Sequence, residues 1–292
     1  MSIRRSGSNA GKGESALFST GHLIWIAISA VLIAAGLFCC FHFRPGLKRV
    51  LTVCCFVALA SEFVKFFSTV QIVPVVKAAI ETIDGVPTLV YNATGEFAPY
   101  LEAEHYPLEL CSLQIIFIFK ARFMREGKWR DRLLAFIYAT GTIGALLGIM
   151  FASTTVVDDY PTILSYFTLP RNYQYFIYHS MLIVLGIYIG FGGEVKIRAE
   201  HWGTTIVGLV ALDAMIFYLN SVLSQPVYNG MDLQGVSYHI NYFSSYLSQG
   251  GTQMTDKSQW LAYLAGRFGL GVGLITLAFA PFVLRGLRRK QA

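Results

Sequence analysis

Two residues inside apolar stretches of this chain have the chemistry of a nucleophile and its base. Cys111 lies in the stretch Pro107–Phe123, and His179 lies in the stretch Tyr173–Gly193. A thiolate is a strong nucleophile, and an imidazole that titrates near neutral pH can take the proton from the thiol. Each residue alone is equally consistent with packing between helices. As a pair they predict covalent catalysis, provided that the fold brings them together.

Two further residues share a helix face with this pair. Tyr175 lies one turn before His179, and Gln114 lies three residues after Cys111. We expect Tyr175 to orient the imidazole. We expect Gln114, or a backbone N–H near Cys111, to stabilise an oxyanion. Pro107 is predicted at the first position of the helix that carries Cys111.

Further ionisable residues fall within the apolar stretches, among them Glu62, Lys65, Glu109, Asp213 and Arg267. Ionisable groups inside a membrane are costly and usually face a cavity or a partner. Glu62 and Lys65 are three residues apart, so either they neutralise each other or one of them binds a lipid headgroup. We expect Arg267 to contact a phosphate. Asp213 is expected to pair with a neighbouring helix or to line an ion path.

About seven stretches are long enough to position these residues as membrane-spanning helices, each with roughly 20 mainly apolar residues. The predicted fold class is therefore all-α, a polytopic membrane helix bundle. The third stretch is the weakest because polar residues interrupt it, and a re-entrant third segment is the alternative. The stretches are His22–Phe43, Val50–Val70, Pro107–Phe123, Leu133–Ala152, Tyr173–Gly193, Thr204–Ser224 and Trp260–Leu284.

The depth of the polar residues indicates where they meet. At ~1.5 Å per residue, Cys111 and Lys65 lie about 6–8 Å from the outer ends of their helices. By the same measure His179 and Arg267 lie about 9–10 Å deep, whereas Asp213 falls near the middle of its helix. This common level predicts one polar cavity that opens toward the outer leaflet.

The positions of the basic residues predict the orientation. Most of the 23 Lys and Arg residues fall in every second loop and in the C-terminal tail. The positive-inside rule then places the C-terminus in the cytoplasm and the N-terminus outside, in a multi-pass protein of the cell membrane.

The remaining segments complete the predicted organisation. A polar tail of residues 1–21 precedes the bundle of residues 22–285, and a basic cytoplasmic tail of residues 286–292 follows it. Two outer loops, residues 71–106 and 225–259, are long enough to fold as lids or to be simple insertions.

The composition supports a membrane protein and excludes other classes. Of the 292 residues, 54% are hydrophobic and only 14% are charged, against about a quarter charged in soluble domains. This argues against a disordered chain and a soluble enzyme. The net charge of +6 arises from basic residues that lie mostly on one side of the membrane. It therefore indicates the orientation of the chain, and we expect no nucleic-acid partner.

No zinc-ligand spacing or phosphate loop occurs, so we expect no metal and no cofactor. Membrane lipids are the expected partners, and the oligomeric state is open.

The segment His105–Ser112 resembles the HxPLxLC motif of the YwaF-like family of integral membrane proteins. The segment Tyr173–Ser180 resembles the family's second motif, in which an aromatic run leads to a histidine, and Asn241 begins a match to its Asn-Tyr segment. The family includes a eukaryotic transmembrane phospholipid acyltransferase. The resemblance, over roughly residues 20–285, implies a Cys nucleophile and a His base at Cys111 and His179, with Asn241 near the substrate.

These observations predict an intramembrane acyltransferase or acyl hydrolase that acts on a phospholipid or lysophospholipid. Two other classes remain. One is a secondary transporter or channel whose path is lined by the intramembrane charges. The other is a non-catalytic membrane factor whose outer loops bind a partner.

Overall fold

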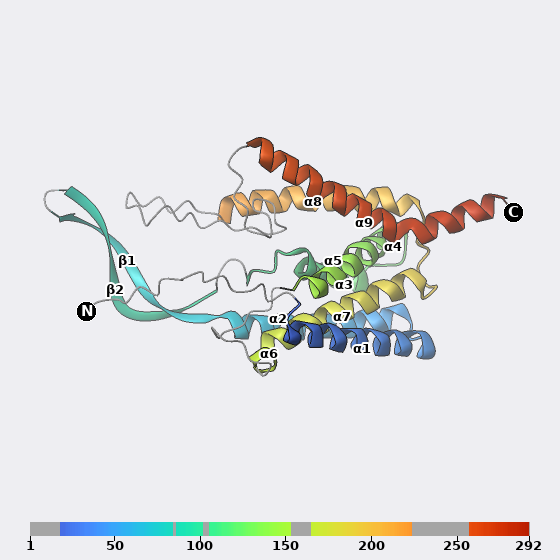
Figure 1. Cartoon of the computed structure of the whole chain (residues 1–292), viewed down its shortest axis with the longest axis horizontal. Coiled ribbons are helices and arrows are strands. Elements are labelled where there is room, and N and C mark those ends of the chain that lie inside the picture. The colour runs from blue at the N-terminus through green and yellow to red at the C-terminus, as the bar shows by residue number, and fades with distance from the viewer. Residues whose placement is uncertain (1–17, 84–85, 102–104, 153–164, 224–256, 292) are drawn as a thin grey trace.

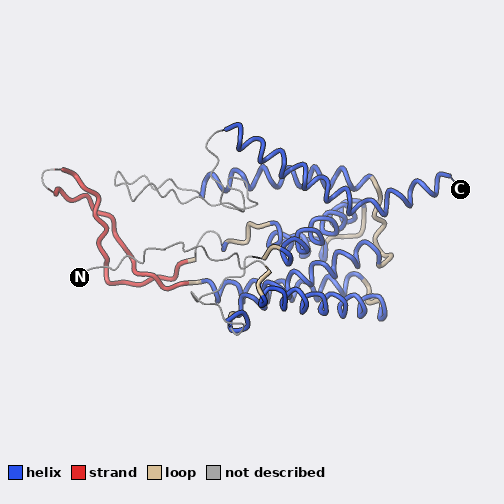
Figure 2. Tube along the Cα trace, viewed as in Figure 1, coloured by secondary structure: helices blue, strands red, loops and turns tan. Residues whose placement is uncertain are grey.

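The computed structural model of the chain describes residues 18–83, 86–101, 105–152, 165–223 and 257–291. Six of its helices are long and apolar enough to cross a bilayer. Figures 1 and 2 show that these helices run in similar directions. The predicted multi-pass helical bundle is therefore confirmed. The six are α1 (Thr20–Phe43), α2 (Leu47–Thr69), the continuous run of α4 (Lys128–Phe136), η2 (Ile137–Gly141) and α5 (Thr142–Met150), α7 (Pro170–Phe191), α8 (Glu200–Leu223) and α9 (Lys257–Gln291).

The third predicted span forms only a short helix. α3 covers Leu110–Phe123, which is 14 residues, whereas a span needs roughly 20. The chain turns through residues 105–109 first, where the Leu108 N–H donates to the Tyr106 carbonyl. The prediction that Pro107 begins the helix is therefore wrong, because Pro107 lies in this turn and α3 begins three residues later.

α3 runs antiparallel to α2 inside the bundle. Arg122, near the end of α3, donates a hydrogen bond to Thr52, near the start of α2. At the opposite ends, Cys111 of α3 lies within electrostatic range of Lys65 of α2. This pairing brings two of the candidate residues to the same level.

The first predicted outer loop is a β-hairpin. β1 (Gln71–Ile83) pairs antiparallel with β2 (Val86–Tyr100), with a register shift between Pro74 and Val76. Figure 2 shows the hairpin projecting from one end of the helical bundle. The sequence held a signal for it, since residues 84–85 are Asp-Gly, the pair favoured in two-residue hairpin loops. The second predicted loop, residues 225–259, lies outside the described residues up to residue 256.

α7 occupies the centre of the bundle, where it packs against α1, α2, η2 and α5. On the α1 side the Trp25 ring stacks on Phe176, with ring centroids 5.0 Å apart, and meets Tyr173 edge to face. Trp25 also stacks on Phe167 of the short helix α6 (Ser165–Thr168). These aromatic contacts fix the half of α7 that carries His179.

Two glycines of α7 allow it to approach η2 closely. A Cβ at Gly186 would lie 1.9 Å from the Thr142 Oγ1, and one at Gly190 would lie 2.7 Å from the Tyr138 ring. Since lipid tails are as apolar as leucine, close packing of this kind holds membrane helices together. The glycines of α9 differ, because within the described parts of the chain a Cβ at Gly266, Gly269 or Gly273 would meet nothing within 4 Å.

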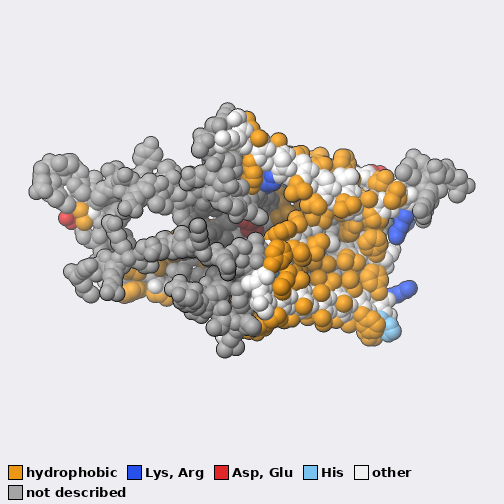
Figure 3. Space-filling model, viewed as in Figure 1, with side chains coloured by type: hydrophobic (Ala, Val, Ile, Leu, Met, Phe, Trp, Pro, Cys, Tyr) orange, Lys and Arg blue, Asp and Glu red, His pale blue; other side chains and the backbone are white. Residues whose placement is uncertain are grey.

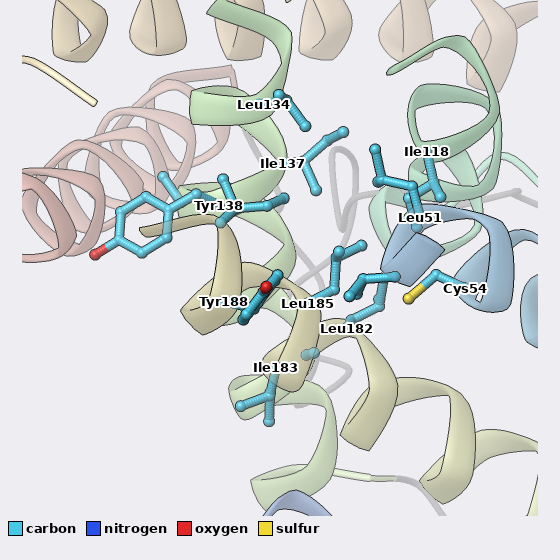
Figure 4. Close-up of a cluster of buried hydrophobic side chains, with 14 of the residues drawn as sticks. Leu51, Cys54, Ile118, Leu134, Ile137, Tyr138, Leu182, Ile183, Leu185 and Tyr188 are labelled. Carbon is cyan, nitrogen blue, oxygen red and sulfur yellow. The ribbon is translucent and has the colours of Figure 1, made fainter. Parts of the chain in front are cut away.

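The buried core lies where α2, α3, α4, η2 and α7 meet. Figure 4 shows side chains from these elements converging there, among them Leu51, Ile118, Leu134, Ile137, Leu182 and Leu185. On the visible outer surface of the helical body, hydrophobic side chains predominate, as Figure 3 shows. That arrangement is expected for helices surrounded by lipid.

The end of the bundle opposite the hairpin is tied by polar contacts. The Leu47 N–H, at the start of α2, donates to the Glu194 carboxylate at 2.7 Å. The Tyr188 hydroxyl donates to the Pro45 carbonyl beside it. α9 continues to Gln291, so most of the predicted basic tail, residues 286–292, is a continuation of the last helix. Figure 1 shows the C-terminus leaving the bundle at this end.

Candidate functional site

Cys111 is the second residue of α3, in its first turn. The first four N–H groups of a helix have no partner within the helix and carry partial positive charge, which favours a nearby anion. The backbone N–H and the hydroxyl of Ser112 lie against the Cys111 thiol. Cys111 is thus closer to the helix start than its sequence position indicated. Its half-buried thiol also lies within electrostatic range of the Glu109 carboxylate, and both burial and this charge oppose a thiolate.

His179 lies on α7 with 3% of its surface exposed. Its Nδ1 is 2.7 Å from the Tyr175 carbonyl oxygen. A carbonyl oxygen only accepts hydrogen bonds, so in the neutral imidazole Nδ1 carries the proton and Nε2 carries the lone pair. A general base needs an available lone pair, and this tautomer provides one at Nε2.

Two tyrosines of α7 connect the surroundings of Cys111 and His179. The Tyr178 hydroxyl donates to the Cys111 carbonyl at 2.8 Å. The Tyr175 ring lies 4.1 Å from the His179 ring, centroid to centroid, and its hydroxyl donates to the Gly148 carbonyl at 2.8 Å. Tyr175 also lies within electrostatic range of Cys111. Among the described residues no hydrogen bond joins Cys111 directly to His179.

The glycine face of α5 borders His179 and the residue that precedes Cys111. A Cβ at Gly144 would lie 3.8 Å from the side chain of Leu110, which precedes Cys111. One turn further, a Cβ at Gly148 would lie 2.9 Å from His179 Nε2 and 3.2 Å from the Tyr175 hydroxyl. The lack of a side chain at Gly148 therefore leaves the space that the imidazole occupies.

The Glu62–Lys65 pair belongs to the same site. Lys65 Nζ lies 2.6 Å from Glu62 Oε1 on α2, as their spacing predicted. Lys65 lies within electrostatic range of Cys111, and Glu62 within range of Tyr178. The three neighbouring helices α2, α3 and α7 thus carry Cys111, His179, Tyr175, Glu62 and Lys65, and α7 contacts α2 and, through Tyr178, α3.

Three other predicted site residues are placed differently. Arg267 of α9 contacts both carboxylate oxygens of Asp213 of α8 at 2.7 Å, so these two charges pair between neighbouring helices. Gln114 is buried and donates to Thr140 of η2 at 2.9 Å, so its amide points to the π-turn and its role at an oxyanion stays a prediction. Asn241 lies outside the described residues.

A groove of about 470 Å³ opens beside the site, between α2 and α7. Its walls are mainly apolar, with Val57, Val64 and Ile177 among them, and Tyr178 forms part of it. One polar pair lines it, in which the Gln174 amide donates to the Ser61 hydroxyl at 2.7 Å. Tyr178 thus separates the groove from the Cys111 backbone.

Sequence reasoning missed Tyr178, Gly148 and the contact between His105 and Arg171. His105 Nδ1 lies 3.3 Å from Arg171 NH1 at the start of α7. A signal existed for Tyr178, because it lies one turn after Gln174 and next to His179. None existed for Gly148, since only the packing of α5 on α7 brings it to the imidazole.

A comparison with models of protein families shows to which family the chain belongs. The family model described as the TMEM164 family matches residues 17–279. No curated protein matches the chain, and no solved structure does. Because the match covers most of its length, the chain belongs to the TMEM164 family, which is a family of membrane proteins.

Proposed function

We propose that this member of the TMEM164 family transfers or hydrolyses the acyl groups of membrane lipids, with Cys111 as nucleophile and His179 as base. One observation carries the proposal: the Tyr175–His179 segment of α7 holds the base while its Tyr178 hydroxyl binds the Cys111 backbone. The similarity of two sequence segments to the YwaF-like motifs points to the same two residues. This similarity is a more specific relationship than the match to the TMEM164 family.

In the proposed first step His179 Nε2 takes the proton from the Cys111 thiol. The thiolate attacks the carbonyl carbon of an acyl ester, and an S–C bond forms as the carbonyl becomes an oxyanion. The oxyanion collapses, the ester C–O bond breaks, and the leaving alkoxide takes the proton from His179. A thioester and a lipid alcohol result.

In the second step His179 takes a proton from water or from the hydroxyl of a lysophospholipid. The oxygen attacks the thioester carbonyl, and the S–C bond breaks to release the Cys111 thiolate, which takes the proton back from His179. The N–H groups at the start of α3 supply the oxyanion with hydrogen-bond donors. Catalytic hydrogen bonds are often long before substrate binds, so a closer approach of Nε2 to the thiol is expected in the complex.

The groove between α2 and α7 is the proposed route for the acyl chain. A chain that lies against Val57, Val64 and Ile177 would bring its ester to Tyr178, beside Cys111. Lys65 is the cation in range of the thiol, so it, more directly than Arg267, would meet the lipid phosphate. The groove lies toward the hairpin end of the bundle, the predicted outer side.

The test is covalent labelling combined with an acyl-transfer assay on purified protein with a panel of phospholipids and lysophospholipids. A thiol-directed acyl probe is expected to label wild type at Cys111, and His179→Asn is expected to abolish labelling. Cys40→Ala, a change of another half-buried cysteine, is the matched control and should label normally. Full acyl transfer by Cys111→Ala would refute the proposal.

The transport alternative remains distinguishable. It requires charges that move with a substrate, whereas Asp213 with Arg267 and Glu62 with Lys65 each form a close ion pair. Transport predicts flux into proteoliposomes that Asp213→Asn abolishes and Cys111→Ala leaves unchanged. A non-catalytic factor predicts neither flux nor labelling that depends on His179.

A further inference from the structure

A second pocket, of about 600 Å³, lies at the far end of α3 from Cys111. It is bordered by the last turn of α3, the first turn of α4 and the first turns of α8. Lys120, which lines it, is nine residues after Cys111, so about 13 Å of helix separates this pocket from the candidate catalytic residues.

Two cations line the pocket without an acidic partner. Lys120 and Arg132 form no ion pair within the described parts of the chain. Of the carboxylates nearby, Glu126 lies 3.8 Å from Arg130 and Glu200 lies 3.6 Å from Arg198. Asp131 precedes Arg132 in the sequence but does not line the pocket. The pocket therefore presents positive charge that an anion would neutralise.

The rest of the pocket is mainly apolar and open. Leu133 and the exposed Val207 line it, with Thr204 as a further polar residue, and among the described residues a Cβ at Gly203 would meet nothing within 4 Å. Trp129 borders it with 73% of its surface exposed, and the Arg132 guanidinium lies 4.9 Å from its ring centroid. Tryptophan beside arginine is typical of the membrane–water interface, where headgroups meet acyl chains.

From this combination we infer that the pocket between α3, α4 and α8 binds an anionic phospholipid. Its phosphate lies between Lys120 and Arg132, and an acyl chain runs along Val207 and Leu133. An ion alone would leave the apolar wall uncovered, and a zwitterionic lipid would leave the excess positive charge unbalanced. Basic pockets between membrane helices bind anionic headgroups in this way.

The role of the pocket's positive charge is tested by native mass spectrometry. The full chain in detergent is titrated with phosphatidylglycerol or with phosphatidylcholine. Wild type is expected to retain phosphatidylglycerol more strongly. The double variant Lys120→Gln/Arg132→Gln should lose at least about tenfold in affinity for it, because both charge-assisted hydrogen bonds to the phosphate are removed. Affinity for phosphatidylcholine should be unchanged.

The matched control is Arg125→Gln/Lys128→Gln, which removes two exposed cations from the same end of the bundle but not from the pocket. It should bind phosphatidylglycerol like wild type, and an equal loss in both double variants would overturn the inference, because it would indicate general surface charge.

The apolar wall and the source of the phosphate are tested separately. Gly203→Leu places a side chain in the open pocket and should weaken binding of both lipids, with the helical circular dichroism retained. Unchanged binding in this variant would overturn the inference. Inorganic phosphate at millimolar concentration should displace no phosphatidylglycerol, and full displacement would equally overturn it, since the site would then be one for free phosphate.

Discussion

The Tyr178 hydroxyl of α7 contacts the Cys111 backbone directly, so it fixes the proposed nucleophile relative to the proposed base on the next residue of α7. Tyr178→Phe removes the donor and keeps the ring. The loss of one hydrogen bond, about 1 kcal/mol, should lower kcat/KM for acyl transfer about fivefold without abolishing labelling of Cys111. Tyr218→Phe, a change of a tyrosine that is 72% exposed, is the control and should change neither quantity.

Gly148 tests the space around the imidazole. Gly148→Ala would place a Cβ 2.7 Å from His179 Cδ2, so the ring must move from its hydrogen bond to Tyr175. Displacement of a reacting group by about 1 Å can cost ~100-fold, and we expect a loss of that order in acyl transfer. Gly144→Ala meets only an ordinary contact of 3.8 Å and should remain active. Equal activity of the two variants would argue against His179 as the base.

At the scale of elements, α7 positions the base because α1 holds its first half. Trp25 is 1% exposed and contacts Tyr173 and Phe176 of α7. Trp25→Ala should lower the free energy of unfolding by about 3–5 kcal/mol, measured by thermal denaturation in detergent. Trp129→Ala removes a ring that is 73% exposed and should cost far less. Similar losses would mean that the α1–α7 contact does not support the bundle.

Another contact joins the start of α2 to the segment after α7. Glu194 accepts from the Leu47 N–H, so its carboxylate satisfies one N–H at the start of the helix and interacts favourably with the helix dipole. Glu194→Ala should lower stability by about 1 kcal/mol. Glu96→Ala, on the exposed part of β2, should leave the denaturation midpoint unchanged. A midpoint unchanged in both variants would refute the capping role.

At the scale of the molecule, the hairpin and the C-terminus lie at opposite ends of the bundle. The positive-inside prediction places the hairpin outside. A cysteine at Glu96, in a chain whose exposed Cys39 is replaced by serine, should react with a membrane-impermeant maleimide on intact cells. A cysteine at Arg125 should react only after the membrane is opened. The reverse pattern would invert the predicted orientation.

The sequence by itself determined the class of fold and the positions of the helices. The seven apolar stretches became helices, six of them within five residues of their predicted bounds, because a backbone surrounded by lipid must satisfy its hydrogen bonds internally. The last helix continues seven residues past its predicted end. Two parts of the structure differ from the predicted fold, each for a local reason. α3 is short because the chain turns at Pro107, and the first outer segment pairs with itself as a hairpin, which its Asp-Gly signal favours.

The sequence predicted which residues form the candidate site, but not how their side chains are arranged in space. Helix depth predicted Cys111, His179 and Lys65 at one level, and the structure places them on the neighbouring helices α3, α7 and α2. Depth alone also grouped Arg267 with them, whereas the structure pairs Arg267 with Asp213. Only tertiary packing decides which faces of separate helices meet, so it alone revealed the contacts of Tyr178 with Cys111 and of Gly148 with His179.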